Sequence, residues 1–125
     1  MKYRKLGTTN LNVSVICLGT MTFGEQNSQS DAFKQMDYAV ERGVNFFDTA
    51  EMYPAYPQKE TYGKSEEIIG NWLKNKKNRD KIILATKVAS GHPKGIGATG
   101  LSWIRQGGKN LRFDKNNMNK AINDS

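Results

Sequence analysis

Two short apolar segments that each end in a charged residue constrain the fold of this chain most. The first, residues 45–48, ends in Asp48, and the second, residues 81–87, ends in Lys87. A charged group at the end of a buried strand is costly unless it has a partner or a function. If the two strands are parallel, their carboxyl ends lie side by side, and Tyr53 in the following loop can join them. The pattern therefore predicts that Asp48, Tyr53 and Lys87 converge on one site.

Two segments with helical spacing separate the predicted strands. Ser30 is expected to cap the first, with Asp31 in its first turn, and Ser65 the second. Their apolar residues recur at helical intervals: Phe33, Met36 and Val40, then Ile68, Ile69, Trp72 and Leu73. With a further buried strand at 16–20, the order is strand, helix, strand, helix, strand. Short links between alternating elements predict parallel strands and an α/β fold.

Composition narrows the class of protein less than these patterns do. The 125 residues suit one domain, and the net charge of +7 comes from the second half of the chain. That excess fits an anionic ligand, nucleic acid or solubility equally, but no interleaved aromatic and basic pattern favours nucleic acid. Cys17 is the only cysteine, which excludes an intrachain disulfide. No apolar run approaches the roughly 18 residues of a membrane span. We therefore expect a soluble cytoplasmic protein without nucleic-acid or membrane partners.

Four ordered motifs carry a family resemblance. They are LGTM at 18–21, FDTAEMY at 47–53, YGKSEEIIG at 62–70 and ATK at 85–87. Together they resemble the aldo-keto reductases, and within them most closely the bacterial group that also resembles potassium-channel beta subunits. The resemblance covers residues 2–90 and returns at 116–125. It implies a TIM barrel that binds NADPH and reduces the carbonyl of a small aldehyde or ketone.

The resemblance also implies roles for individual residues. The family has a catalytic tetrad of Asp, Tyr, Lys and His, and Asp48, Tyr53 and Lys87 match its first three members. The family histidine follows the fourth barrel strand, before which this sequence ends, and His92 does not match it. By family position, the residues expected to line the site near nicotinamide or substrate are Thr20, Met21, Gln26 and Asp48.

The chemistry of carbonyl reduction explains why these residue types are suitable. Hydride addition to a carbonyl carbon leaves an alkoxide that needs a proton. A phenol with a pKa near 10 donates poorly at neutral pH unless a cation stabilises its phenolate. Lys87 is expected to supply that cation, and Asp48 to keep the ammonium charged and aimed.

Structural roles for the same residues stay open. Asp48 alone suits a turn cap, Lys87 a strand-end lysine, and Tyr53 a loop aromatic like Tyr56 and Tyr62 nearby. Residues 95–100 match the dinucleotide fingerprint G-x-G-x-x-G, but they begin seven residues after the strand and no helix starts on them. Chance in a glycine-rich loop explains this match better.

A TIM barrel requires eight strand–helix units in about 250 residues. We expect one domain over 1–125: an amino-terminal hairpin at 2–16, three barrel strands with two helices at 16–88, a long loop at 89–115 and the start of a third barrel helix at 116–125. The chain is thus predicted to be the amino-terminal portion of a truncated barrel, with little or no activity alone. The alternative is a non-catalytic fragment or binding module.

Overall fold

A three-stranded parallel sheet forms the centre of the protein. The computed structural model describes residues 1–89 and 113–125. The strands are β3 (Leu18–Gly19), β4 (Phe46–Asp48) and β5 (Ile83–Ala85), in the order β3-β4-β5. In register, Gly19 lies beside Asp48, and Asp48 lies beside Ala85. The parallel arrangement predicted from the alternating elements is confirmed.

An antiparallel hairpin precedes the sheet. Its strands are β1 (Tyr3–Lys5) and β2 (Asn12–Ser14), and Gly7 adopts a left-handed φ of 57° in the link between them. Asn45 connects this hairpin to the start of β4. Its side-chain oxygen accepts a hydrogen bond from the Ser14 backbone at 2.7 Å, and its side-chain nitrogen donates to the Asn12 carbonyl at 3.0 Å.

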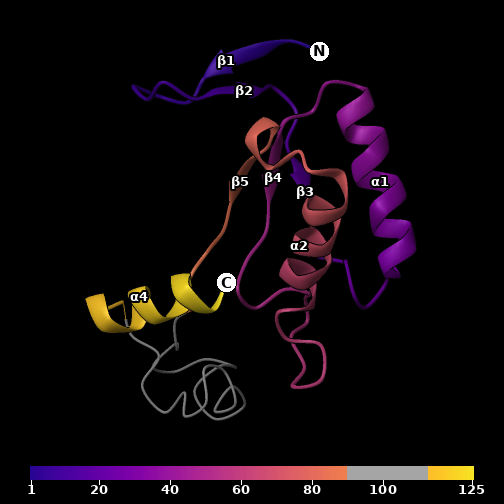
Figure 1. Cartoon of the computed structure of the whole chain (residues 1–125). Helices are drawn as coiled ribbons and strands as arrows, with labels where there is room; N and C mark the ends of the chain where they lie inside the picture. The colour runs from indigo at the N-terminus through magenta and orange to yellow at the C-terminus, as the bar shows by residue number, and fades with distance from the viewer. Residues whose placement is uncertain (90–112) are drawn as a thin grey trace.

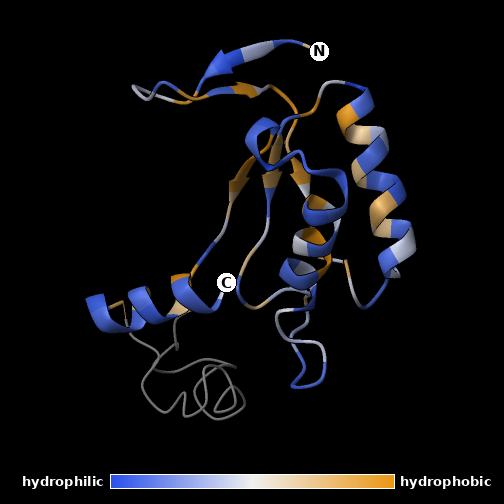
Figure 2. Ribbon diagram, viewed as in Figure 1, coloured by the Kyte–Doolittle hydropathy of each residue, from blue (hydrophilic) through white to orange (hydrophobic). Residues whose placement is uncertain are grey.

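Helices α1 (Gln29–Glu41) and α2 (Lys64–Lys76) pack together beside the sheet (Figure 1). A 3-10 turn, η1 (Arg79–Lys81), then leads into β5, and α4 (Lys115–Asp124) lies toward the end where the strands finish (Figure 1). Figure 2 shows that β3, β4 and β5 are largely apolar, whereas the helices carry apolar stripes on polar surfaces. The predicted loop at 89–115 lies largely outside the described residues, as do His92 and the glycines of 95–100.

The core lies between the two helices and one face of the sheet. It includes Phe23, Met36, Phe47, Ile68, Ile69 and Trp72. Phe47 is completely buried, and its ring centroid lies 5.7 Å from that of Trp72. Because successive side chains of a strand point to opposite faces, Asp48 faces away from this core. The sheet thus presents its charged strand ends on the face opposite the helices.

Both predicted helix caps differ from the structure. Ser28 caps α1, and its hydroxyl accepts a hydrogen bond from the Asp31 backbone at 3.2 Å, whereas Ser30 already lies within the helix. Gly63, in a left-handed conformation, precedes α2 without a side-chain cap. Ser65 is buried, and its hydroxyl bonds to the carbonyls of Thr20 and Phe23 at 3.1 and 2.7 Å. The Ser65 hydroxyl therefore makes a tertiary contact and does not cap the helix.

Asp37 on α1 joins the two helices. Its carboxylate accepts hydrogen bonds from the Trp72 indole and from the Lys76 ammonium, both at 2.9 Å. The bond from Lys76 is the largest influence on the pKa of Asp37. Together with the bond from Trp72 it outweighs the opposing effect of burial, so the pKa is lowered.

This lowered pKa predicts how stability depends on pH. A carboxylate with a lowered folded-state pKa contributes stability above its unfolded value of 3.8, and that contribution is lost as pH falls through the folded-state value. We expect Asp37→Asn to reduce the free energy of unfolding above this window, and the difference from wild type to vanish below it. Urea unfolding followed by far-UV circular dichroism at several pH values measures the difference. Glu41→Gln, an exposed change on the same helix, is the control, and a pH-independent difference would contradict the prediction.

The described helices are too short or too polar to cross a bilayer. Residues 1–89 and 113–125 contain no helix of sufficient length and apolar character for a membrane span.

Candidate active site

The structure brings Asp48, Tyr53 and Lys87 together. The Lys87 ammonium donates a hydrogen bond to the Asp48 carboxylate at 2.6 Å and a second one to the Thr49 carbonyl, also at 2.6 Å. The same nitrogen lies 4.7 Å from the centroid of the Tyr53 ring, within the range of a cation–π contact. An acid, a cation and a phenol thus form one cluster.

The parallel strands position this cluster. Asp48 is the last residue of β4, and Lys87 lies two residues after β5, on the same face as Ala85. Backbone hydrogen bonds continue past the strand ends, from Thr49 to the Ala85 carbonyl at 2.9 Å and from Glu51 to the Lys87 carbonyl at 3.0 Å. Lys87 is therefore held beside β4 although it lies outside the formal strand.

The charges of the cluster favour protonated Lys87. Burial is the largest single influence on the pKa of Lys87 and favours the neutral amine. Hydrogen bonding to Asp48 and Tyr53, with the charges of both groups, outweighs burial and raises the pKa. The Lys87 and Asp48 side chains are 48% and 39% exposed, so solvent screens their pairing. The ammonium is accessible to a ligand and remains charged at neutral pH.

Thr20 reaches the cluster through the backbone. Its side chain is completely buried, and its hydroxyl donates to the Asp48 carbonyl at 3.0 Å. Its backbone N–H donates to the same carbonyl at 3.1 Å. The Thr20 hydroxyl therefore contacts the backbone of Asp48 and helps to hold the end of β4.

Met21 and Gln26, also predicted to line the site, are both exposed. The Met21 carbonyl accepts a hydrogen bond from Ala55 at 3.0 Å, which places Met21 beside the loop that carries Tyr53. Its side chain is open to solvent at the end of β3. Gln26 lies in the turn between Phe23 and Asn27 that precedes α1.

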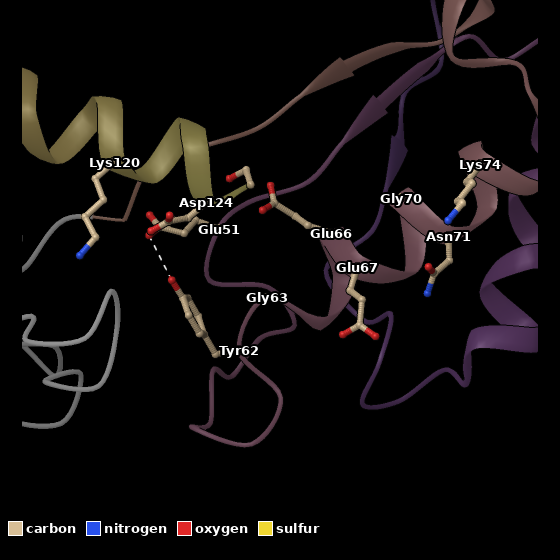
Figure 3. A pocket seen from close by; sticks show the side chains of 11 residues that line it. Glu51, Tyr62, Gly63, Glu66, Glu67, Gly70, Asn71, Lys74, Lys120 and Asp124 are labelled. Carbon is tan, nitrogen blue, oxygen red and sulfur yellow. Dashed lines mark hydrogen bonds between the residues drawn. The ribbon is translucent and has the colours of Figure 1, made fainter.

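Two residues near the cluster did not stand out in the sequence. Glu51 is only 4% exposed, and its carboxylate accepts a hydrogen bond from the Tyr62 hydroxyl at 3.2 Å (Figure 3). The sequence signal that could have identified Glu51 was an acidic residue inside the motif at 47–53. Cys17 immediately precedes β3. The pKa of its thiol is raised, mainly by partial burial and then by the negative charge of Asp48, although the positive charge of Lys87 opposes this rise.

A hollow of about 750 Å³ adjoins the cluster without containing it. It lies between α2 and α4, and among its lining residues are Glu51, Tyr62, Glu66, Lys74, Lys120 and Asp124 (Figure 3). Asp48, Tyr53 and Lys87 are not among them. In the part of the chain that the structure describes, no three His, Cys, Asp or Glu side chains gather as metal ligands would.

Comparison with known proteins identifies the family. Residues 15–125 match the model of the aldo/keto reductase family. The chain is 42% identical to Protein tas of Escherichia coli over 129 residues, which is 100% of this chain and 34% of that protein. It is 43% identical to norsolorinic acid reductase B of Dothistroma septosporum over 74% of this chain and 24% of that protein.

Solved structures agree with this assignment. An aldo-keto reductase from Bacillus halodurans in its holo form superposes with a TM-score of 0.59 and 38% identity, over 76% of this chain and 28% of that one. A putative aldo-keto reductase from Pseudomonas aeruginosa matches with a TM-score of 0.57 and 33% identity, over 70% and 31%. The chain belongs to the aldo/keto reductase family.

The matched relatives are much longer than this chain. It spans about a third of Protein tas and about a quarter of the fungal reductase. The three parallel strands and their helices correspond to part of the TIM barrel of these proteins, as the sequence predicted. The predicted likeness to the potassium-channel beta-subunit group stays a prediction.

Proposed function

We propose that the whole protein reduces the carbonyl of a small aldehyde or ketone with NADPH, that Tyr53 is the general acid, and that residues 1–125 alone have little or no activity. The observation that carries the proposal is the position of the Lys87 ammonium, 2.6 Å from the Asp48 carboxylate and 4.7 Å from the Tyr53 ring centroid. Family membership and the reductase names of the matched relatives support the reaction class.

Each residue of the cluster has a separate task in this proposal. Tyr53 donates its hydroxyl proton to the carbonyl oxygen as that oxygen becomes an alkoxide. Lys87 stabilises the negative charge that is left on the tyrosine oxygen. Asp48 and the Thr49 carbonyl hold the ammonium in place through the two 2.6 Å bonds. Bound NADPH would supply the hydride to the carbonyl carbon.

The open face of the sheet fits the reacting end of such a cofactor. Gly19 lies beside Asp48, and a Cβ added at Gly19 would meet nothing within 4 Å, so a flat ring has room there. Met21 has a solvent-exposed side chain at the same strand end. We therefore assign Met21 and Asp48 to the cofactor region, Gln26 to the same region on family position alone, and Thr20 to the support of Asp48. NADPH rather than NADH is part of the proposal.

Isotope transfer tests the reaction. We expect the whole protein to consume NADPH only when an aldehyde such as 4-nitrobenzaldehyde is present, and residues 1–125 alone to consume little or none. With NADPH deuterated at the transferable position of its nicotinamide C4, the alcohol product should carry one deuterium on its carbinol carbon, as measured by mass spectrometry. A parallel assay with NADH tests the cofactor preference. NADPH consumption without aldehyde, or an alcohol without deuterium, would contradict hydride transfer.

A further inference from the structure

Glu51 is a buried carboxylate that the proposed chemistry does not use. One of its oxygens accepts from the Tyr62 hydroxyl at 3.2 Å, and the other accepts from the Ala89 backbone N–H at 2.7 Å. Its own backbone N–H donates to the Lys87 carbonyl at 3.0 Å. A buried carboxylate is costly unless hydrogen bonds compensate it. Two of these bonds reach the segment after β5, one at Lys87 and one at Ala89.

We propose that Glu51 is a positioning residue that sets where the Lys87 ammonium lies, because its carboxylate holds the backbone at Ala89, two residues after Lys87. Lys87 is two residues beyond β5, where the regular strand has ended. The backbone bond to the Lys87 carbonyl continues the ladder past the strand, and the bond from the Ala89 N–H to the Glu51 carboxylate takes its place beyond that point. Only the purpose of this positioning, the stabilisation of the Tyr53 oxygen by Lys87, rests on the proposed function.

The geometry around Lys87 shows why its backbone must be held. A lysine side chain has four rotatable bonds and loses considerable rotamer freedom when its ammonium is fixed. Its two 2.6 Å contacts, with the Asp48 carboxylate and the Thr49 carbonyl, persist only if the backbone stays at the right distance. Glu51 follows Asp48 by three residues, so one short segment supplies both the partner of the ammonium and the anchor of its backbone.

The surroundings of Glu51 orient its carboxylate. Tyr62, from the loop before α2, points its hydroxyl at Glu51, and Asp124 of α4 lies close by (Figure 3). On the other side of the same backbone, the Thr86 hydroxyl donates to Glu66 of α2 at 2.5 Å. The segment after β5 is therefore held by Glu66 of α2 at Thr86 and by the Glu51 carboxylate at Ala89, with Lys87 between these two contacts.

The titration of Lys87 tests the positioning role without any assay of catalysis. In the full chain with 13C-labelled lysine, NMR follows the Lys87 side chain through its titration, and the Lys87→Met spectrum identifies its signal. Burial lowers the pKa of Lys87, and hydrogen bonding to Asp48 and Tyr53 together with their charges outweighs it, so the pKa is raised. We expect Glu51→Ala to lower this pKa toward its ordinary value, because the Lys87 ammonium would no longer lie against the Asp48 carboxylate.

Two further variants separate positioning from charge. Glu51→Gln keeps an oxygen that can accept the Ala89 N–H and should keep the pKa of Lys87 raised. Glu67→Ala removes an exposed glutamate that pairs with Lys64 at 2.8 Å, and should leave Lys87 unchanged. An unchanged pKa in Glu51→Ala would overturn the proposal. Equal lowering in the alanine and glutamine variants would also overturn it, because the charge of Glu51 would then be responsible.

A variant outside Glu51 covers the case in which Glu51→Ala does not fold. Ala89→Pro removes the N–H donor and leaves the carboxylate intact, so we expect it to lower the pKa of Lys87. An unchanged value in Ala89→Pro would overturn the proposal. If Lys87 responds as expected but the protein transfers no hydride to an aldehyde, the proposed function fails and the positioning role of Glu51 stands.

Discussion

Tyr53→Phe should lower the turnover of NADPH-dependent carbonyl reduction by the whole protein by about 10²–10⁴-fold, the usual contribution of a positioned general acid. Phenylalanine keeps the ring that lies under the Lys87 ammonium but lacks the hydroxyl proton that the alkoxide needs. Steady-state consumption of NADPH with 4-nitrobenzaldehyde measures the loss. Cofactor binding, followed by fluorescence titration, should change little, because the variant removes a proton donor and not the open face of the sheet.

Tyr56→Phe is the matched control. It makes the same substitution three residues later in the same loop, at a side chain that is 89% exposed. We expect wild-type turnover for it. Equal losses in Tyr53→Phe and Tyr56→Phe would show that the loop as a whole matters rather than the Tyr53 hydroxyl. Wild-type turnover in Tyr53→Phe would remove this residue from the role of general acid.

Phe47→Ala should reduce the free energy of unfolding by about 3–5 kcal/mol, the range for a buried aromatic residue replaced by alanine. Phe47 is completely buried and packs on Trp72, with ring centroids 5.7 Å apart. The substitution removes apolar contact and leaves a cavity between the sheet and α2. A small domain is stable by about 5–15 kcal/mol, so the variant should be close to unfolding. Urea unfolding monitored by far-UV circular dichroism measures the change.

Phe113→Ala is the control for this prediction, because the same ring is removed where it is largely exposed. Surface substitutions of this kind usually change stability by less than about 0.5 kcal/mol. A similar loss in both variants would contradict the assignment of Phe47 to the core.

The position of Phe47 also matters for the site, because the adjacent Asp48 points to the opposite face. A weaker anchor at Phe47 should loosen the end of β4.

The order of elements and the predicted cluster were accessible from the sequence because they depend on local periodicity. Ile68 and Trp72 are one helical turn apart on α2, and Met36 belongs to the apolar stripe of α1; all three are buried in the core. Asp48 and Lys87 each end an apolar segment, and parallel pairing of consecutive strand–helix units places such ends together. Period-two alternation then separates Phe47, which faces the helices, from Asp48. These features need only the sequence and the rules of regular secondary structure.

The tertiary structure decided what individual polar side chains do. Ser65 has the right residue type and position for a helix cap, yet its hydroxyl bonds to carbonyls more than forty residues away in sequence. Thr20 lies beside the cluster but turns its hydroxyl to the Asp48 backbone. Glu51 accepts from Ala89, 38 residues later. Hydrogen bonds depend on distance and direction between groups that only folding brings together, so no pattern along the chain specifies them.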